Sequence, residues 1–301
     1  MSYTPLTKYT RYLNNLLVAS GRNAMWLDRL NDASSFVSDA AQAGTVVVPV
    51  VTAFTAQTIT DGTLQTNQFN NTTASLTGYD RTVPISLKPS QLRAAEWSNP
   101  ENIAVIAEQA ADGLRKVLAA QVIADLVAAS PGFSKTLTTG KIDFASATQT
   151  EIAMLDFLVA SVIANSNADP SELTILTTPT GMANLFAARN ALVGFTGLGL
   201  SNEGYLNYAG IPIFPVAATT TNWGTSGKAA AFVVHKSAYT LAKLMAYPHD
   251  PDRFWVPEGD GTYKHLINGT WFGGVSLAGV LGKIVNPTAY GVTAWPPRFT
   301  T

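Results

Sequence analysis

The residues that could carry out chemistry are few and scattered along this 301-residue chain. The three histidines are His235, His249 and His265, and no two of them have the spacing of metal ligands. Cysteine is absent, which excludes disulfides, thiolate metal sites and a cysteine nucleophile. The best local group of titratable side chains is His249-Asp250-Pro251-Asp252, which could bind a cation or orient a catalytic base. A surface turn that contains proline carries such residues for solubility, and this simpler interpretation is favoured.

Two further segments resemble binding motifs without completing them. Glu258-Gly259-Asp260-Gly261 offers carboxylate oxygens but lacks the ligand positions of a calcium loop, so a turn explains it better. Gly197-Leu198-Gly199 is not followed by the lysine and hydroxyl residue of a phosphate loop. A triad of Ser, His and Asp that meets only in the fold stays open. We therefore predict no catalytic residue, no cofactor-binding residue and no metal ligand, and expect a protein that is not an enzyme.

The composition is poor in charge for a chain of this length. Charged residues make up 13% of the sequence, about half of the usual quarter, and the mean hydropathy is +0.13. No uninterrupted apolar run reaches the length of a membrane helix, since the longest candidate, Val46 to Ile59, contains Pro49. The N-terminus has no basic-then-apolar signal, so export is not expected. We infer that much of the surface is covered by other copies of the same chain.

The net charge of −1 predicts no bulk attraction to nucleic acid, but the charge is unevenly distributed. Up to Leu30, four basic residues stand against one acidic residue; they are Lys8, Arg11, Arg22 and Arg29 against Asp28. A solvated arm and an arm that contacts an anionic interior or a neighbouring subunit both fit this pattern. Met1 to Ala43 is polar and mixed, with a helical segment around Asn23 to Leu30, and we expect it to pack on something outside itself.

The element around which the chain is organised is a long helix from Asn99 to Ser130. Asn99 can cap it, Pro100 suits the first position, and Ser130-Pro131-Gly132 ends it. Its length is about 45 Å at about 1.5 Å per residue. The apolar stripe that predicts the helix consists of Ile103, Ile106, Ala110, Leu114, Val117, Leu118, Val122 and Leu126. A long core helix of a globular enzyme is the alternative interpretation.

A long hairpin is predicted before this helix. Strand-like sequence begins at Thr45 and runs to Thr60, and Pro49 within it favours an edge position. Asp61-Gly62 signals a turn, and Thr82 to Leu87 is the second strand. Two isolated strands are marginal in water, so we expect this hairpin to need a partner.

The second half of the chain alternates helices and strands. A helix is predicted over Glu151–Asn165, and its inward residues are Ile152, Leu155, Leu158, Val159 and Val162. A second helix, with Thr178 as its cap, is predicted to continue over Met182–Asn190, and Val193–Tyr208 is expected to be a loop. Strands are predicted at Leu173–Thr177, Gly210–Val216 (an edge strand by its two prolines), Ala229–His235, Tyr239–Tyr247, Tyr263–Ile267 and Trp271–Val285, with Asn268-Gly269 as a hairpin turn. This interleaving predicts an α+β fold.

This order of parts resembles the major capsid proteins of tailed bacteriophages, which have the Hong Kong 97-type fold. Three segments carry the resemblance in addition to the arm, hairpin and long helix. They are Leu173-Thr174-Ile175-Leu176-Thr177 followed by Pro179-Thr180-Gly181, then Tyr208-Ala209-Gly210-Ile211-Pro212-Ile213, then Ala231-Phe232-Val233-Val234-His235-Lys236, and they are similar to the A-domains of that family. Encapsulin shells share the fold, so an encapsulin-like nanocompartment is the alternative.

The resemblance implies a division of the chain into five parts. Residues 1–43 would be the N-terminal arm, 44–90 the extended E-loop hairpin, and 91–150 the P-domain with its spine helix. Residues 151–235 would be the A-domain. Residues 236–301 would supply returning strands of the P-domain, part of the A-domain and the C-terminal tail.

The function that the resemblance implies is assembly. Copies of the chain would form hexamers and pentamers of an icosahedral shell that encloses dsDNA without reading its sequence. Scaffolding, portal and decoration proteins are the expected partners, with the scaffold a separate protein, and no membrane or cofactor is involved. The shell would belong to the virion and assemble in the host cytoplasm. The lysine–asparagine cross-link of some relatives is not transferred, because no motif fixes either partner. A soluble hydrolase that uses His249 and Asp250 is an alternative from a different class.

Overall fold

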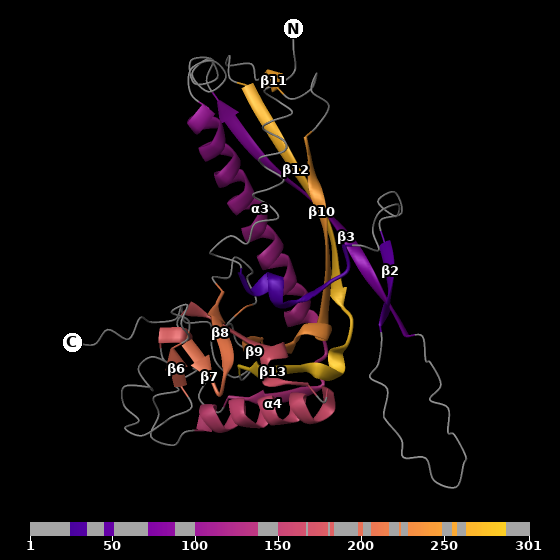
Figure 1. Ribbon diagram of the computed structural model, residues 1–301, viewed down its shortest axis with the longest axis vertical. Helices are drawn as coiled ribbons and strands as arrows, with labels where there is room; N and C mark the ends of the chain where they lie inside the picture. Colours follow the sequence, from indigo (N-terminus) through magenta and orange to yellow (C-terminus); the bar gives the residue numbers. More distant parts are fainter. Residues whose placement is uncertain are drawn as a thin grey trace, which may run out of the picture.

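The computed structural model describes residues 25–34, 45–50, 72–87, 100–137, 150–166, 168–179, 181–183, 198–200, 206–216, 223, 228–248, 255–257 and 263–286. These residues form an α+β fold in which a long helix, α3 (Pro100–Ala128), accompanies two mixed β-sheets (Figure 1). The α+β class predicted from the sequence is confirmed. Among the described residues, no helix combines the length and the apolar character needed to span a membrane.

The first sheet is long and narrow and has the order β1-β10-β12-β3-β2, with β11 paired to β12. Its strands are β1 (Asn31–Asp32), β2 (Thr45–Val50), β3 (Thr72–Leu87), β10 (Tyr239–Pro248), β11 (Trp255–Pro257) and β12 (Tyr263–Val275). β3 and β12 are antiparallel, in register from Gly273 opposite Thr77 to Tyr263 opposite Leu87. α3 lies along this sheet and packs on β3 and β12 (Figure 1).

The second sheet has the order β4-β13-β9-β5-β8-β7-β6. Its strands are β4 (Phe133–Thr136), β5 (Leu173–Thr177), β6 (Leu198–Leu200), β7 (Leu206–Tyr208), β8 (Ile211–Pro215), β9 (Ala229–His235) and β13 (Leu281–Val285). Helix α4 (Thr150–Ser166) packs on β13, β9 and β4. β5 and β9 are buried along their whole length, as expected for central strands covered on both faces.

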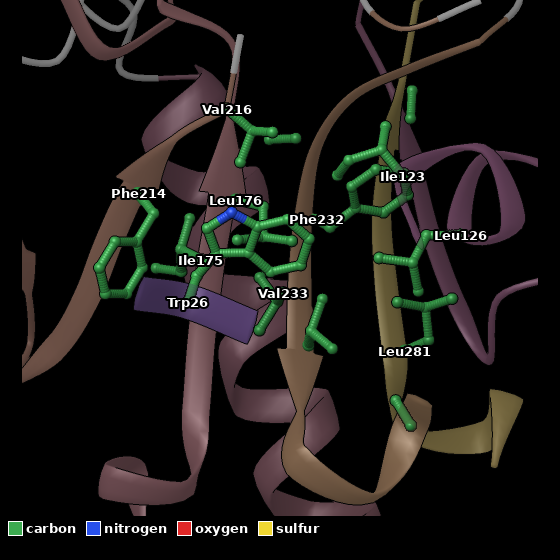
Figure 2. Packing of buried hydrophobic residues seen from close by; sticks show 14 of the residues in the cluster. Trp26, Ile123, Leu126, Ile175, Leu176, Phe214, Val216, Phe232, Val233 and Leu281 are labelled. Carbon is green, nitrogen blue, oxygen red and sulfur yellow. The ribbon is translucent and has the colours of Figure 1, made fainter. Parts of the chain in front are cut away.

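The main hydrophobic core lies around the second sheet. It combines residues of β5, β8, β9 and β13 with α4, the second half of α3 and Trp26. Figure 2 shows Trp26 with Ile175 and Phe232, and Ile123 and Leu126 of α3 near Leu281. The indole of Trp223 stacks on the ring of Phe232, with the ring centroids 5.0 Å apart. The far end of α3 therefore belongs to the core of the second sheet, although most of the helix lies along the first.

The structure confirms the long helix and most of its apolar stripe. Leu114, Leu118, Val122 and Leu126 are buried. Val117 was expected in the stripe but is 38% exposed, because the buried face is centred between Leu118 and Ile123 and Val117 lies outside it. The side chains of Ile103, Ile106 and Ala110 lie outside the described residues.

The predicted hairpin exists, but its second strand is much longer than expected. β2 and β3 pair antiparallel from Thr45 opposite Thr77 to Val50 opposite Thr72. Among the described strands, β2 is the last of this sheet, in agreement with the edge position predicted from Pro49. β3 begins at Thr72 rather than Thr82 and also pairs with β12 of the same chain. The expectation that the hairpin needs a partner outside its own chain is therefore wrong for these strands. Residues 51–71 lie outside the described part.

The described end of the N-terminal arm packs on its own chain, which corrects the expectation that it packs elsewhere. It forms a short 3-10 helix, η1 (Met25–Arg29), in which Trp26 and Leu27 are buried. β1 then pairs parallel with β10, and Ala33 N donates to the carbonyl oxygen of Leu241 at 2.9 Å. Residues 1–24 and 35–43 lie outside the described part.

Two local predictions about strands are wrong. Asn268-Gly269 is not a turn, because β12 continues through it with β3 on one side and β10 on the other. β8 is not an edge strand, since it lies between β5 and β7. β7 pairs only with Ile211 to Ile213, so Pro215 at the end of β8 lies beyond this partner.

Elsewhere the predicted elements are close to those observed. α4 buries Leu155, Leu158 and Val162 as expected. The hydroxyl of Thr178 accepts a hydrogen bond from Gly181 N at 3.1 Å, which caps the start of the next helix as predicted, whereas residues 184–190 of that helix lie outside the described part. The expected loop at Val193–Tyr208 contains β6 and β7, which pair antiparallel.

Placing an acidic residue on the two sides of α3 tests this packing. Leu118→Asp should lower the free energy of unfolding by about 3 to 5 kcal/mol, since the new carboxylate would be buried without a partner. The adjacent Val117→Asp, on the exposed side, should cost about 1 kcal/mol or less. Urea unfolding followed by circular dichroism measures both, and equal losses would show that α3 is packed differently.

Candidate functional site at the junction of the two sheets

The two sheets are joined by two short crossings of the chain. The chain passes from β9 to β10 through the 3-10 helix η5 (Lys236–Ala238) and returns from β12 to β13 through η7 (Ala278–Val280). The carbonyl oxygen of Ala238 accepts from Ser276 N at 2.9 Å and from Leu277 N at 3.3 Å, so the crossings are bound to each other. We call this region, His235–Tyr239 together with Val275–Leu281, the junction.

A chain of hydrogen bonds runs from the N-terminal segment into the junction. Asn31 Nδ2 donates to Thr240 Oγ1 at 3.1 Å, and the Thr240 hydroxyl donates to Ser276 Oγ at 2.9 Å. The Ser276 hydroxyl in turn donates to the carbonyl oxygen of Ser237 at 2.7 Å. Each hydroxyl accepts one hydrogen bond and donates one, so these polar groups are satisfied away from bulk water.

His235 is the one histidine whose side-chain surroundings the described residues include. It is buried, its Nδ1 lies 2.6 Å from Ser237 Oγ, and its Nε2 lies 3.2 Å from Glu172 Oε2. Ser237 N also donates to Nδ1, at 3.3 Å. Because a backbone N–H donates to Nδ1, the ring proton is assigned to Nε2, which donates to the Glu172 carboxylate.

These three side chains resemble a nucleophilic triad in type but act as a helix cap. Ser237 lies two residues after His235, and its hydroxyl and its own backbone N–H share the same ring nitrogen. His235 is the N-cap of η5 and accepts from Ser237 N. The arrangement therefore fixes the start of the crossing. Within the described ranges, no group of three or more His, Asp or Glu side chains could hold a metal ion.

Glu172 links this cap to the surface. Its carboxylate accepts from Lys236 and from His235, and these two contacts lower its pKa, Lys236 contributing most. Glu172 ends the 3-10 helix η4 (Pro170–Glu172), whose N-cap Asp169 accepts from Ser171 N at 2.8 Å. Arg29 Nη2 donates to the carbonyl oxygen of Ser171 at 2.9 Å. The N-terminal segment is thus also tied to the second sheet.

Asp125 attaches the last turns of α3 to the first sheet. Its carboxylate accepts from Tyr239 of β10 at 2.7 Å, from Tyr79 of β3 at 3.2 Å and from Gln121 Nε2 at 3.0 Å. Burial raises the pKa of Tyr239, and the charge of Asp125 raises it further. A Cβ atom at Gly273 would lie 2.5 Å from the Tyr239 hydroxyl, so only glycine leaves room for this tyrosine.

Lys283 attaches the same end of α3 to the second sheet. Its Nζ donates to the carbonyl oxygens of Val127 at 2.7 Å and Ala129 at 3.0 Å. The lysine is 8% exposed, and burial lowers its pKa. The last carbonyls of a helix have no partner within the helix and carry partial negative charge, so a buried cation satisfies and stabilises them.

The segment that follows α3 is also held at the junction. Gly132 N donates to the carbonyl oxygen of Ala278 at 2.7 Å, and a Cβ atom at Gly132 would lie 2.5 Å from the carbonyl oxygen of Gly279. Asn165 Nδ2 of α4 donates to that same oxygen at 2.7 Å. The end of α3, α4 and both crossings therefore meet at one place.

Among the residues that the structure describes, the two candidate histidines of the sequence lie in different elements. His235 lies at the junction, and His265 lies in β12 with its backbone opposite Ile85 and Trp255. His249-Asp250-Pro251-Asp252 and Glu258-Gly259-Asp260-Gly261 lie outside the described residues, as does Gly197. Gly199 belongs to β6.

Sequence reasoning missed Asp125, Lys283 and Glu172. A signal existed for the first two, because each is a single charge within an apolar segment: Asp125 lies between Ile123 and Leu126, and Lys283 between Leu281 and Ile284. A charge at such a position needs a buried partner.

No family model and no curated protein matches the sequence. The fold, however, is similar to solved structures of shells. The capsid of cyanophage P-SCSP1u shares 16% identity over 90% of each chain, with a TM-score of 0.54. A virus-like particle from Pyrococcus furiosus shares 12% identity over 92% of this chain and 98% of that chain, with a TM-score of 0.55. The capsid of an empty GTA particle shares 12% identity over 89% of this chain and 92% of that one, with a TM-score of 0.52. This chain has the fold of phage capsid proteins, as the sequence resemblance implied.

The lowered pKa of Glu172 predicts how the contribution of its contacts to the free energy of unfolding depends on pH. Because the folded-state pKa is lowered, the contribution is present above the ordinary glutamate pKa and is lost as the pH falls through the folded value. Glu172→Gln should therefore be less stable than the wild type at pH 7, and this difference should disappear in acid. Lys236→Met, which removes the main cause of the shift, should reduce the same pH dependence. Urea unfolding between pH 3 and 7 measures this, and a difference that stays constant with pH would contradict it.

Proposed function

We propose that this chain is the major capsid protein of a tailed bacteriophage, a structural subunit that assembles into hexamers and pentamers of an icosahedral shell enclosing dsDNA. The main support is the fold, which the chain shares over 90% of its length with 90% of a cyanophage capsid chain. The low charge of 13% is a second support, since a subunit covered by its neighbours needs fewer charges on its surface.

The parts of such a subunit are assigned to the chain as follows. Residues 1–43 are the N-terminal arm, 44–90 the E-loop hairpin, 91–150 the P-domain with α3 as its spine, and 151–235 the A-domain. Residues 236–301 supply strands of the P-domain, part of the A-domain and the C-terminal tail. Of their strands, β10 and β12 belong to the first sheet and β13 to the second. The arrangement of α3 beside the first sheet and of α4 on the second supports this division (Figure 1).

The partners that follow from this function are mainly other copies of the chain. Packaged dsDNA would be contacted through its phosphates without sequence readout. Scaffolding, portal and decoration proteins are further partners, and the function needs no cofactor, metal ion or membrane. The protein would assemble in the host cytoplasm and reside in the virion capsid.

A shell that encloses something other than a phage genome is the second candidate. The virus-like particle from Pyrococcus furiosus favours it, since this chain covers 98% of that chain. An encapsulin-like compartment would have the same subunit architecture, and only its contents would differ.

Expression of the chain alone tests the proposal. Size-exclusion chromatography and negative-stain microscopy should show closed particles. Nuclease-protected dsDNA in particles from infected cells would favour the phage capsid, and an enclosed enzyme would favour the compartment. A stable monomer whose hydrolytic activity is abolished by His249→Ala would contradict both.

Shortening the segment between β2 and β3 tests assembly without changing the fold of the subunit. Replacing residues 53–69 with a two-residue Asn-Gly turn keeps the β2–β3 ladder and the buried Leu76. We expect an unchanged midpoint of urea unfolding but no closed shells, because an E-loop would then be missing from each contact between neighbours. Normal particles from this variant would contradict the assignment of this hairpin as an E-loop.

A further inference from the structure

We propose that the contacts of Asp125 and Lys283 at the end of α3 lock the angle between the two sheets and thereby set the curvature of the shell. The link to curvature rests on the proposed function. The lock itself is a property of the single subunit and can be tested without a shell.

The lock consists of two sets of hydrogen bonds, which connect the same end of α3 to the first sheet and to the second sheet. Asp125 accepts from Tyr239 and Tyr79 of the first sheet at 2.7 and 3.2 Å. Lys283 of the second sheet donates to the carbonyl oxygens of Val127 and Ala129. These acceptors follow Asp125 by two and four residues, so about one helical turn carries both attachments.

The crossings alone do not fix the angle. η5 and η7 are three residues long and are bound to each other through Ala238, Ser276 and Leu277. Two adjacent short connections define a line about which the sheets can rotate, and a contact away from that line is needed to stop the rotation. α3, which packs on β3 and β12 and ends at β13, supplies this contact.

The buried polar groups of the lock favour one angle between the two sheets. Lys283 is 8% exposed, and without it the final carbonyls of α3 lose their donor. Tyr239 is fully buried, and without Asp125 its hydroxyl loses its acceptor. A buried polar group left without a partner is costly, so the sheets cannot slide through intermediate angles at little cost.

The N-terminal segment provides a separate attachment that keeps the variants folded. Trp26 lies in the core of the second sheet, Arg29 donates to the carbonyl oxygen of Ser171, and β1 pairs with β10. Loss of the lock should therefore loosen the angle and leave both sheets intact. In a closed shell each copy repeats the same angle, so a small change in the subunit becomes a change in diameter.

The experiment uses Lys283→Met and Asp125→Leu in the full chain, with particle diameters measured by negative-stain microscopy. We expect particles with a shifted or broadened diameter distribution. Lys116→Met is the matched control on α3, since that side chain is 62% exposed and forms a surface ion pair with Asp112, and it should keep the wild-type diameter. Ile213→Ala, in the buried strand β8 between β5 and β7, lowers stability away from the junction and should also keep it.

Three results would overturn the lock. Both junction variants could give the wild-type diameter distribution, or Ile213→Ala could broaden it equally at the same loss of stability. If the wild type forms no particles, the proposed function fails, and small-angle scattering of the subunit decides the lock: unchanged scattering curves for Lys283→Met and Asp125→Leu would overturn it. If either variant does not fold, Tyr239→Phe takes its place in the same measurements, because it removes only the hydroxyl group that donates to Asp125.

Discussion

The structure depends on how the buried end of one long helix is satisfied. Helix carbonyls in the last turn have no partner of their own, and those of α3 face the place where two sheets meet. Lys283 of β13 donates to these carbonyls. Asp125, about one turn earlier in α3, accepts hydrogen bonds from the hydroxyls of Tyr79 in β3 and Tyr239 in β10. Because one charge belongs to the helix and the other to the second sheet, the helix end is fixed from both sides.

The remaining polar groups of the junction reinforce this arrangement. His235 caps the crossing from the second sheet to the first, and Glu172 holds His235 and Lys236. Ser276 connects the return crossing to the outgoing one. A group of residues that resembles a hydrolytic triad by type is therefore part of the frame that joins the sheets. Under the proposed function, this frame would keep the shape of the subunit the same in every copy of the shell.

Sequence patterns predicted the elements whose burial is set locally. The helical stripe of α3, the inward face of α4 and the apolar strand Leu173–Thr177 each follow from spacing alone. The full length of β3 was missed because its first half is polar and becomes a strand only between β2 and β12. Asn268-Gly269 and the prolines of β8 were misjudged for the same reason, since neighbouring strands override turn and edge propensities. The junction was not predictable, because its partners are separated by up to 209 residues.

A reconstruction by electron cryomicroscopy of the particles formed by the purified chain tests the central claim most directly. The account predicts closed shells in which every copy keeps Lys283 on the last carbonyls of α3 and Tyr239 on Asp125. A chain that stays monomeric, or shells in which α3 is detached from β13 in some copies, would contradict it.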